Sequence, residues 1–262
     1  MTAPIAAHAN RRRWLAAAGA SLAGLWLAAC NKLTENPTSA GVLRSAEGLT
    51  RRVQRLVVDR TALAREFTPA DISPDFRPNG SINPQDPAYQ NHVRTGFADW
   101  KLVVDGLVER PLALSLAELR ALPARSQITR HDCVEGWSSI GKWKGARLGP
   151  LLEKAGLKPN ARYIVLYCAD SLEQSLDGTG QYYESIDLID AYHPQTILAY
   201  EMNDQPLPVA HGAPIRLRVE RQLGYKHAKY VMRLQAVEDF AHIARGKGGF
   251  WEDRGYEWYA GI

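Results

Sequence analysis

The order of apolar and polar residues predicts short β-strands in the C-terminal two thirds of the chain. Residues 100–104 are rich in β-forming side chains and end at an Asp-Gly turn. Residues 196–202 have the same character and end at an Asn-Asp turn. Residues 163–168 form a nearly continuous apolar run, which indicates a strand that is buried on both faces.

Two further segments carry strand signals near the C-terminus. Ile215, Leu217 and Val219 alternate with charged residues, so residues 215–220 are predicted to form a half-buried strand. Residues 229–237 mix strand and helix signals, and we favour a strand.

Helices are predicted at three places. Ser115 and Glu118 form a capping box, which predicts a helix over residues 116–121. Residues 148–155 precede a glycine and are predicted to form a second helix. Residues 185–192 are interpreted as a third.

Strands and short helices follow one another without a regular βαβ period, and this order favours a mixed α+β domain. Residues 30–95 are interpreted as a linker and an irregular N-terminal segment, because residues 31–50 are polar and residues 69–90 contain five prolines. The folded domain is predicted over residues 96–262, together with part of residues 69–95.

Residues 1–29 have the features of an export signal. Arg11, Arg12 and Arg13 precede Trp14-Leu15 and an apolar stretch rich in alanine and glycine. This arrangement is typical of a twin-arginine signal peptide, which is removed from the mature protein. The alternative is an ordinary N-terminal anchor helix, but the stretch is short for a membrane span.

Cys30 follows Leu27-Ala28-Ala29, which resembles the lipobox of bacterial lipoproteins. In that interpretation Cys30 is lipidated and anchors the mature protein to a membrane. The alternative is a small-residue cleavage site that a cysteine happens to follow.

The net charge of +4 comes largely from the signal peptide. Its removal takes away three arginines and no acid, so the 32 basic residues become 29 against 28 acidic ones. No long Lys/Arg run remains, and we therefore expect no nucleic-acid partner.

The segment from Arg130 to Ser138 holds the first chemical motif, Arg-His-Asp-Cys-Val-Glu-Gly-Trp-Ser. A nearby cation lowers the pKa of a thiol, which suits a nucleophile and a metal ligand equally. Cys133 can also be a small buried apolar residue, or one half of a disulfide with Cys168. Local composition leaves these interpretations open.

Two later segments supply donors for an anionic ligand. They are Pro-Val-Ala-His-Gly-Ala-Pro-Ile-Arg over residues 208–216 and Gly-Tyr-Lys-His-Ala-Lys-Tyr over residues 224–230. Arginine offers a fork that matches phosphate, lysine a compact cation, and glycine lets backbone approach a ligand. In isolation, each segment is equally a turn that enters a strand or a solvated strand face.

Taken in this order, the three segments resemble the sulfite-oxidase superfamily of molybdenum enzymes, over roughly residues 100–236. The resemblance is closer to its bacterial, haem-free branch, which is exported by the twin-arginine route and includes the catalytic subunit of periplasmic methionine-sulfoxide reductase. It implies a single mixed α/β domain of the sulfite-oxidase type with one molybdenum–molybdopterin cofactor. Because this cofactor is inserted in the cytoplasm, the folded protein must be exported, which agrees with the signal peptide.

The resemblance also implies roles for individual residues. Cys133 is the expected thiolate ligand of molybdenum, and such a soft ligand suits a redox-active metal. Contacts to the pterin and its phosphate are expected from Asn79, Cys168, His211, Arg216, His227, Ala228 and Lys229.

Three departures leave the substrate open. His211 stands where the methionine-sulfoxide reductase has asparagine, Cys168 stands where it has threonine, and its aromatic loop ahead of the core is not recognisable. We expect oxygen-atom transfer, in the reductive direction on a sulfoxide that is a small molecule or protein-bound. Sulfite oxidation is the alternative.

Charged residues near Cys133 are candidates for stabilising a developing oxyanion. Arg130 and His131 are two of them, while Lys142 is more simply a surface charge. Glu135 is either an orienting group or a solvated acid.

The sequence contains no Cys-x-x-Cys-His haem motif, so electrons are expected from a membrane haem subunit or a soluble cytochrome. Two other classes of protein stay open. One is a periplasmic binding protein that keeps the fold without turnover. The other is a thiol enzyme in which Cys133 is the nucleophile and a histidine the base.

Overall fold

The computed structural model describes residues 48–175 and 178–262. Residues 58–262 form one compact unit, and a helix over residues 48–57 belongs to a separate N-terminal unit. The predicted signal peptide and Cys30 lie outside the described residues. Within the described ranges, no helix has the length and apolar character needed to cross a membrane.

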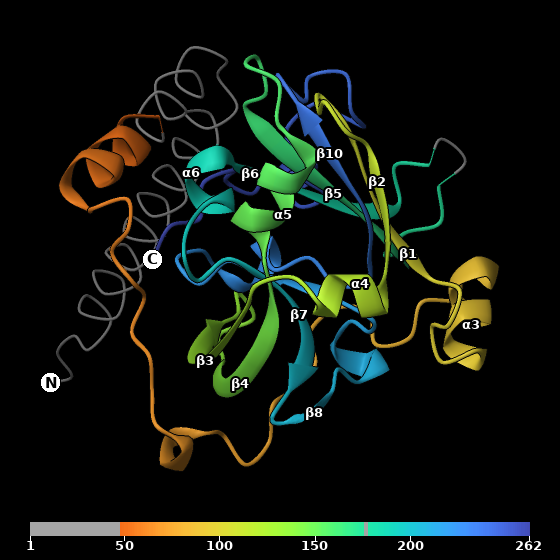
Figure 1. The fold of residues 1–262 in the computed structure, drawn as a ribbon. Coiled ribbons are helices and arrows are strands. Elements are labelled where there is room, and N and C mark those ends of the chain that lie inside the picture. The colour runs from red at the N-terminus through yellow and green to blue at the C-terminus, as the bar shows by residue number, and fades with distance from the viewer. Residues whose placement is uncertain (1–47, 176–177) are drawn as a thin grey trace, which may run out of the picture. The chain divides into compact units, whose positions relative to one another are not determined.

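A five-stranded sheet forms one half of the larger unit. Its order is β2 (Leu112–Ser115), β1 (Lys101–Gly106), β10 (Val231–Val237), β5 (Tyr163–Ser171) and β6 (Gln181–Asp187) (Figure 1). β1 and β10 pair in parallel, and the other neighbours are antiparallel. The predicted strands at residues 100–104, 163–168 and 229–237 are therefore confirmed.

The second sheet contains β3 (Ala124–Asp132), β4 (Ser138–Arg147), β7 (Ile197–Met202) and β8 (Gln205–Pro206), with β9 (Arg216–Arg218) paired to β7. All of its pairs are antiparallel. The turn after β7 uses positive φ angles of 50° at Asn203 and 62° at Asp204. These two residue types accept this conformation more readily than most, which explains why the strand ends there.

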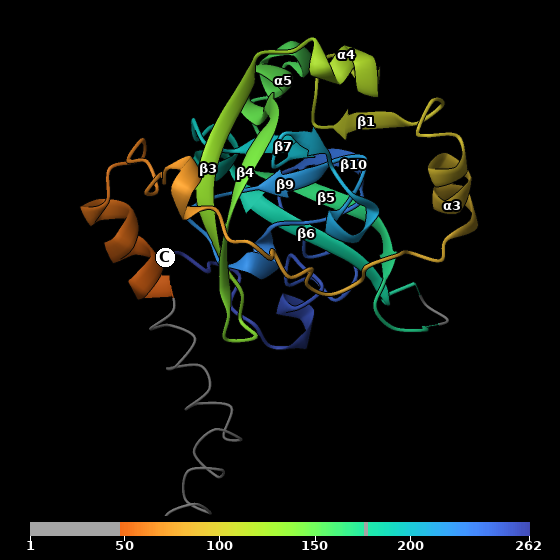
Figure 2. The same cartoon turned by 90° about the horizontal axis from the view of Figure 1, so that it is seen from below.

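Four helices connect the strands within residues 58–175 and 178–262: α3 (Pro87–Arg94), α4 (Leu116–Arg120), α5 (Leu148–Ala155) and α6 (Leu188–Ala191). Short 3₁₀ turns occur at η1 (Pro69–Asp71), η2 (Val209–His211), η3 (Gly224–Lys226) and η4 (Glu252–Arg254). The capping box at α4 and the glycine that follows α5 are as predicted. α4 and α5 lie near one another on the same side of the sheets (Figure 2).

α3 begins inside the stretch interpreted as irregular. Pro87 opens the helix, where a missing N–H costs nothing, and Asp86 caps it through the Tyr89 amide. Tyr89 is fully buried, and its hydroxyl donates to the carbonyl of Ala213 at 2.7 Å. This hydrogen bond attaches α3 to the folded domain.

The prediction of one helix over residues 185–192 is wrong in its first half. Ser185 and Ile186 belong to β6, where they pair with Val165 and Ile164 of β5. Ser185 and Ile186 are completely buried. Only the four residues of α6 are helical, after Asp187 has capped them through the Asp190 amide. Burial against β5, a long-range contact, decides the conformation in place of local helix propensity.

The prediction of a strand at residues 215–220 is confirmed for residues 216–218, but the prediction that it is half-buried is wrong. β9 is only three residues long, and all three are buried, as is Glu220. Arg218 pairs with Glu220 at 2.6 Å, and the Arg216 and Arg218 guanidinium groups lie 5.1 and 4.5 Å from the centre of the Trp143 ring. Their charges therefore point into a polar interior instead of into solvent.

Gly145 in β4 is required by the close approach of β7, and this generates a stability prediction. A Cβ at this position would overlap the carbonyl of Leu198 and lie 2.6 Å from the Cα of Ala199. We expect Gly145→Ala to lower the free energy of unfolding by about 1–3 kcal/mol, the usual cost of overpacking. Thermal unfolding of both proteins measures this loss.

Gly48→Ala is the matched control, because nothing lies within 4 Å of a Cβ there. An unchanged melting temperature for Gly145→Ala would show that β4 and β7 can separate without cost, against the packing described.

Candidate functional site

Cys133 lies at the start of the loop that joins β3 to β4. Its amide donates to the carbonyl of Trp137 at 2.9 Å, and the amide of Gly136 donates to the carbonyl of Cys133 at 3.1 Å. Gly136 adopts a φ of 84°, which a glycine reaches without strain. The two long strands and this tight loop therefore hold the thiol at a fixed place.

Both cysteines in the described part of the chain are free thiols. The disulfide between Cys133 and Cys168 does not form in this structure, and that alternative is removed. Burial raises the pKa of the Cys133 thiol, and the backbone N–H groups of Glu135 and Val134 oppose this effect. Those N–H groups suit a sulfur that carries negative charge.

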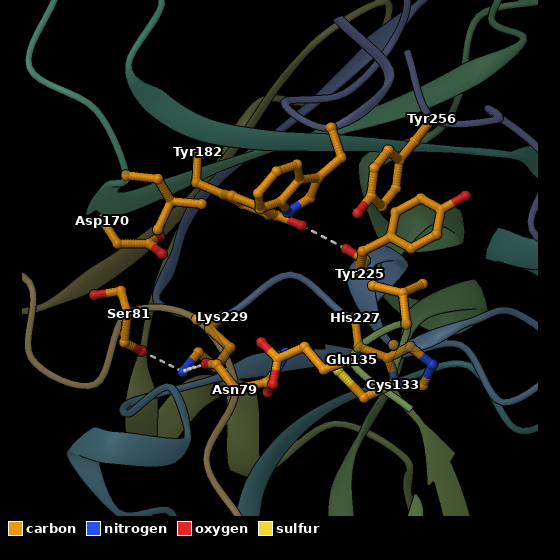
Figure 3. Close-up of a pocket in the computed structure, with 15 residues that line it drawn as sticks. Asn79, Ser81, Cys133, Glu135, Asp170, Tyr182, Tyr225, His227, Lys229 and Tyr256 are labelled. Atoms are coloured by element: carbon orange, nitrogen blue, oxygen red, sulfur yellow. Dashed lines mark hydrogen bonds between the residues drawn. The ribbon is translucent and has the colours of Figure 1, made fainter. Parts of the chain in front are cut away.

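An open pocket lies over Cys133, with about 660 Å³ of empty space when its solvent-facing mouth is included. Four residues that the sequence singled out line it, as Figure 3 shows: Asn79, Cys133, His227 and Lys229. They come from three separate segments of the chain, so their convergence is a tertiary feature.

Lys229 joins two of these segments. Its ammonium donates to the carbonyls of Asn79 at 2.7 Å and Ala210 at 3.0 Å, and also to the carbonyl of Ser81. Burial lowers the pKa of Lys229 to about 7, an effect that Arg216 strengthens and Asp170 opposes. The pocket wall therefore contains a buried lysine whose charge changes near neutral pH.

Arg216 lies behind the pocket lining and is completely buried. It donates to the carbonyl of His211 at 3.2 Å and to the carbonyl of His227 at 3.3 Å, which holds the two predicted cofactor segments together. Burial lowers the pKa of His211 to about 4, so its imidazole is neutral at pH 7.

Two other predicted contacts lie outside the lining. Ala228 is buried, and its carbonyl accepts from the amide of Leu217 at 2.8 Å. Cys168 is 1% exposed on β5 in the main core, and burial raises the pKa of its thiol well above the usual value. It is therefore a protonated thiol in an apolar setting.

The three candidates for oxyanion stabilisation do not provide a free positive charge. His131 is buried, and burial and the charge of Arg218 hold its pKa well below 6.5, so it is neutral. Arg130 pairs with Asp132 at 2.9 Å, and Lys142 pairs with Asp204 at 2.6 Å on the far side of the hairpin. His131 instead accepts from Arg218 at 3.0 Å.

Sequence reasoning missed Asp170, Tyr182, Trp251 and Tyr256 in the pocket lining, and it gave no role to Tyr225 of the 224–230 segment. Asp170 is 3% exposed, and burial raises its pKa to about 7. An acid two residues beyond the predicted buried run of residues 163–168 was a usable signal for it. Tyr182, Trp251 and Tyr256 carried no such signal, because no chemical motif surrounds them in the sequence.

Several polar atoms around the pocket are buried without a hydrogen-bond partner. In the described ranges they include Asn79 Oδ1, Asp170 Oδ1, His211 Nδ1, Arg216 Nε and His227 Nδ1. Buried polar groups in proteins nearly always have partners, and exceptions concentrate at functional sites. This collection of donors and acceptors fits a ligand that is rich in nitrogen, oxygen and phosphate.

Comparison with known proteins agrees with this geometry. Residues 89–242 match the family described as oxidoreductase molybdopterin binding domain. A protein of Azospira oryzae, provisionally named protein-methionine-sulfoxide reductase subunit YedZ1, is 35% identical over 92% of this chain and 84% of its own length.

Two other likenesses are partial. The protein-methionine-sulfoxide reductase catalytic subunit MsrP of Xanthomonas campestris is 34% identical over 56% of this chain and 48% of its own length, so the match spans about half of that relative. The sulfane dehydrogenase SoxCD from Paracoccus pantotrophus aligns with a TM-score of 0.48 at 24% identity, over 54% of this chain and 39% of the other.

The matched region spans more than half of the chain and contains most of the predicted site residues. It supplies Cys133, the buried Arg216 and the segment from His227 to Lys229. The protein is an enzyme, and it belongs to the family of molybdopterin-binding oxidoreductases that the sequence motifs predicted.

Proposed function

We propose that this oxidoreductase reduces sulfoxides by oxygen-atom transfer, with one molybdenum–molybdopterin cofactor and Cys133 as the protein ligand of the metal. The observation that carries the proposal is the convergence of the Cys133 thiol with Asn79, His227 and Lys229 in one pocket. The names of the two relatives support the choice of substrate class.

The residues present fit the cofactor. Cys133 offers the soft thiolate, and Arg216 and Lys229 offer positive charge for a phosphate. Asn79, His211 and His227 each have a buried atom without a partner in the structure, which a pterin can supply. The backbone of Ala228, the Cys168 thiol and the Asp170 carboxyl complete the proposed contacts.

When bound, the cofactor would supply a redox-active metal that can accept an oxygen atom in a two-electron reaction. Overall, a sulfoxide, two protons and two electrons give a thioether and water, with the S–O bond broken. The chain can hold one of these protons on the Asp170 carboxyl, which lines the pocket. Glu135 faces solvent and accepts from Trp137 at 2.9 Å, while Asp170 titrates near neutral pH.

A neutral sulfoxide suits this pocket better than sulfite does. Lys229 is the cation in the lining, and its charge is already used by the proposed contact to the cofactor phosphate. Glu135 and Asp170 line the same pocket and repel a dianion when they are ionised. Sulfite oxidation is therefore the second candidate. A binding protein without turnover fits less well, because it has no use for the Cys133 thiol.

We further propose that the enzyme works in the periplasm and receives electrons from a haem-carrying partner, either a membrane subunit or a soluble cytochrome. The twin-arginine motif supports export of the folded protein. Lipidation of Cys30 would keep the enzyme near a membrane partner.

The first prediction tests the metal ligand and the activity together. Protein from a host that makes molybdopterin should contain near-stoichiometric molybdenum and should reduce methionine sulfoxide with a reduced viologen dye as electron donor. In Cys133→Ala the metal loses its thiolate, and we expect the rate to fall to that of the uncatalysed reaction. Elemental mass spectrometry and dye oxidation measure the two quantities.

Alkylation provides the control for this experiment. In the loaded enzyme Cys133 should resist iodoacetamide and should react once the cofactor is stripped, whereas Cys168 should stay unreactive because it is 1% exposed. A wild type without molybdenum, from a host that loads a known molybdenum enzyme, would overturn the proposal.

The second prediction concerns Arg216. Lysine keeps the charge but cannot reproduce the planar fork, so Arg216→Lys should reduce pterin content by roughly tenfold or more. Pterin is released with acid, oxidised and measured by its fluorescence, alongside thermal unfolding to check the fold. Arg94→Lys, at an exposed arginine of α3, is the matched control. Full pterin content in Arg216→Lys would rule out the proposed contact.

The third prediction concerns the pH dependence of stability in cofactor-free protein. The pKa of Asp170 is raised from 3.8 to about 7, so between these values the folded protein holds a proton that the unfolded chain has released. The free energy of unfolding of the wild type should therefore fall, by up to roughly 1.4 kcal/mol per pH unit, as pH rises through this window.

Asp170→Asn does not titrate and should lack this loss. Urea unfolding of both proteins at pH 4.5 and pH 7 measures the difference. If the stability difference between them is the same at both values, the Asp170 carboxyl does not titrate as described.

A further inference from the structure

Three aromatic rings form one wall of the pocket. Tyr225, Trp251 and Tyr256 all line it, and we name this set the aromatic wall. Trp251 and Tyr256 stack with ring centres 5.3 Å apart and an angle of 28°, and Tyr225 meets Tyr256 edge to face at 5.2 Å. In Figure 3, Tyr225 and Tyr256 lie towards the same end of the view as Cys133 and His227, whereas Asp170 and Ser81 lie at the opposite end.

The aromatic wall is held in position before any ligand binds. The Tyr225 hydroxyl donates to the carbonyl of Glu257 at 2.6 Å, and the Tyr256 amide donates to the carbonyl of Trp251 at 3.0 Å. The Tyr225 ring is fixed by its hydroxyl, and the other two rings by stacking, so little side-chain freedom is lost when a substrate packs against them.

A buried ionic cluster anchors the same segment. Lys226 is 1% exposed, and its ammonium bonds Glu184 at 2.5 Å and Glu252 at 2.6 Å. Glu252 opens η4, directly after Trp251, and Lys226 directly follows Tyr225. The cluster therefore joins the two chain segments that carry the wall.

Two of the three rings lie outside the region that the family match covers. That region ends at residue 242, and Trp251 and Tyr256 follow it. The cofactor contacts at Cys133, Arg216 and Lys229 lie inside it. No cofactor contact is proposed for the three rings, so they are available to contact a substrate.

We propose that the aromatic wall is the substrate-selecting surface and favours neutral sulfoxides with an apolar substituent, such as the side chain of oxidised methionine or an aryl methyl sulfoxide. This inference rests on the proposed sulfoxide reduction. Ring faces carry negative partial charge, so they attract the polarised C–H groups next to a sulfoxide and repel a sulfite dianion. They also make favourable contacts with the sulfur of the thioether product.

The wall has room for such a substituent. Tyr256 is 41% exposed while Tyr225 is 7% exposed, so the pair offers an open ring above a buried one. A sulfoxide with a large apolar group gains contact with both, whereas dimethyl sulfoxide is too small to do so. Selectivity between these two substrates therefore reports on the wall.

The test compares two sulfoxides on the loaded enzyme. We expect Tyr256→Ala to lower the ratio of kcat/KM for methyl phenyl sulfoxide to kcat/KM for dimethyl sulfoxide by about tenfold, or about 1.4 kcal/mol. The loss should appear mainly as a higher KM for the aryl substrate. Tyr256→Phe keeps the ring and should restore the ratio of the wild type.

Tyr192→Ala is the matched control, since Tyr192 is 40% exposed and lies outside the pocket. An unchanged ratio in Tyr256→Ala overturns the inference while the sulfoxide activity of the wild type stands. A fall in pterin content in Tyr256→Ala also overturns it, because the ring would then hold the cofactor. A loaded wild type that reduces neither sulfoxide overturns the proposed function and the inference together.

Discussion

The site depends on one buried guanidinium, that of Arg218. It is completely buried against Trp143 and bonds Glu220, and it also donates to His131 at 3.0 Å. A buried charge is tolerated only when it is paired and its donors are satisfied. Arg218 therefore connects β9, which lies between the cofactor segments, to β3, which ends at Asp132 directly before Cys133. The position of the thiol relative to the pocket follows from this connection.

The same constraint explains why the histidines near the pocket are neutral. Burial and the charges of Arg216 and Arg218 hold the pKa values of His131 and His227 well below 6.5. A neutral imidazole keeps one acceptor nitrogen, which a cation cannot offer. The buried atoms that lack partners lower the stability of the cofactor-free chain, and a ligand that satisfies them stabilises the folded state. Ligand binding therefore adds to the stability of the fold.

Local sequence signals predicted the elements that local interactions determine. The capping box of α4, the glycine after α5 and the apolar run of β5 each act within a few residues, and each was found. The burial of Ser185 and of the β9 arginines depends on partners far along the chain, so local patterns misplaced them. The ordered motifs predicted four residues of the pocket lining. Trp251 and Tyr256 escaped because nothing near them in sequence indicates what they face.

The pocket is built from two kinds of sequence, and this has a functional consequence. The region that matches the family, residues 89–242, supplies the thiol and the buried cations, which are polar and demand defined partners. Segments on either side of it supply Asn79 and two rings of the aromatic wall, Trp251 and Tyr256. Changes in the polar groups leave buried charges unpaired, at a cost of several kcal/mol, whereas changes in a half-exposed ring cost little stability. Substrate choice can therefore vary on this fold while the cofactor chemistry stays constant.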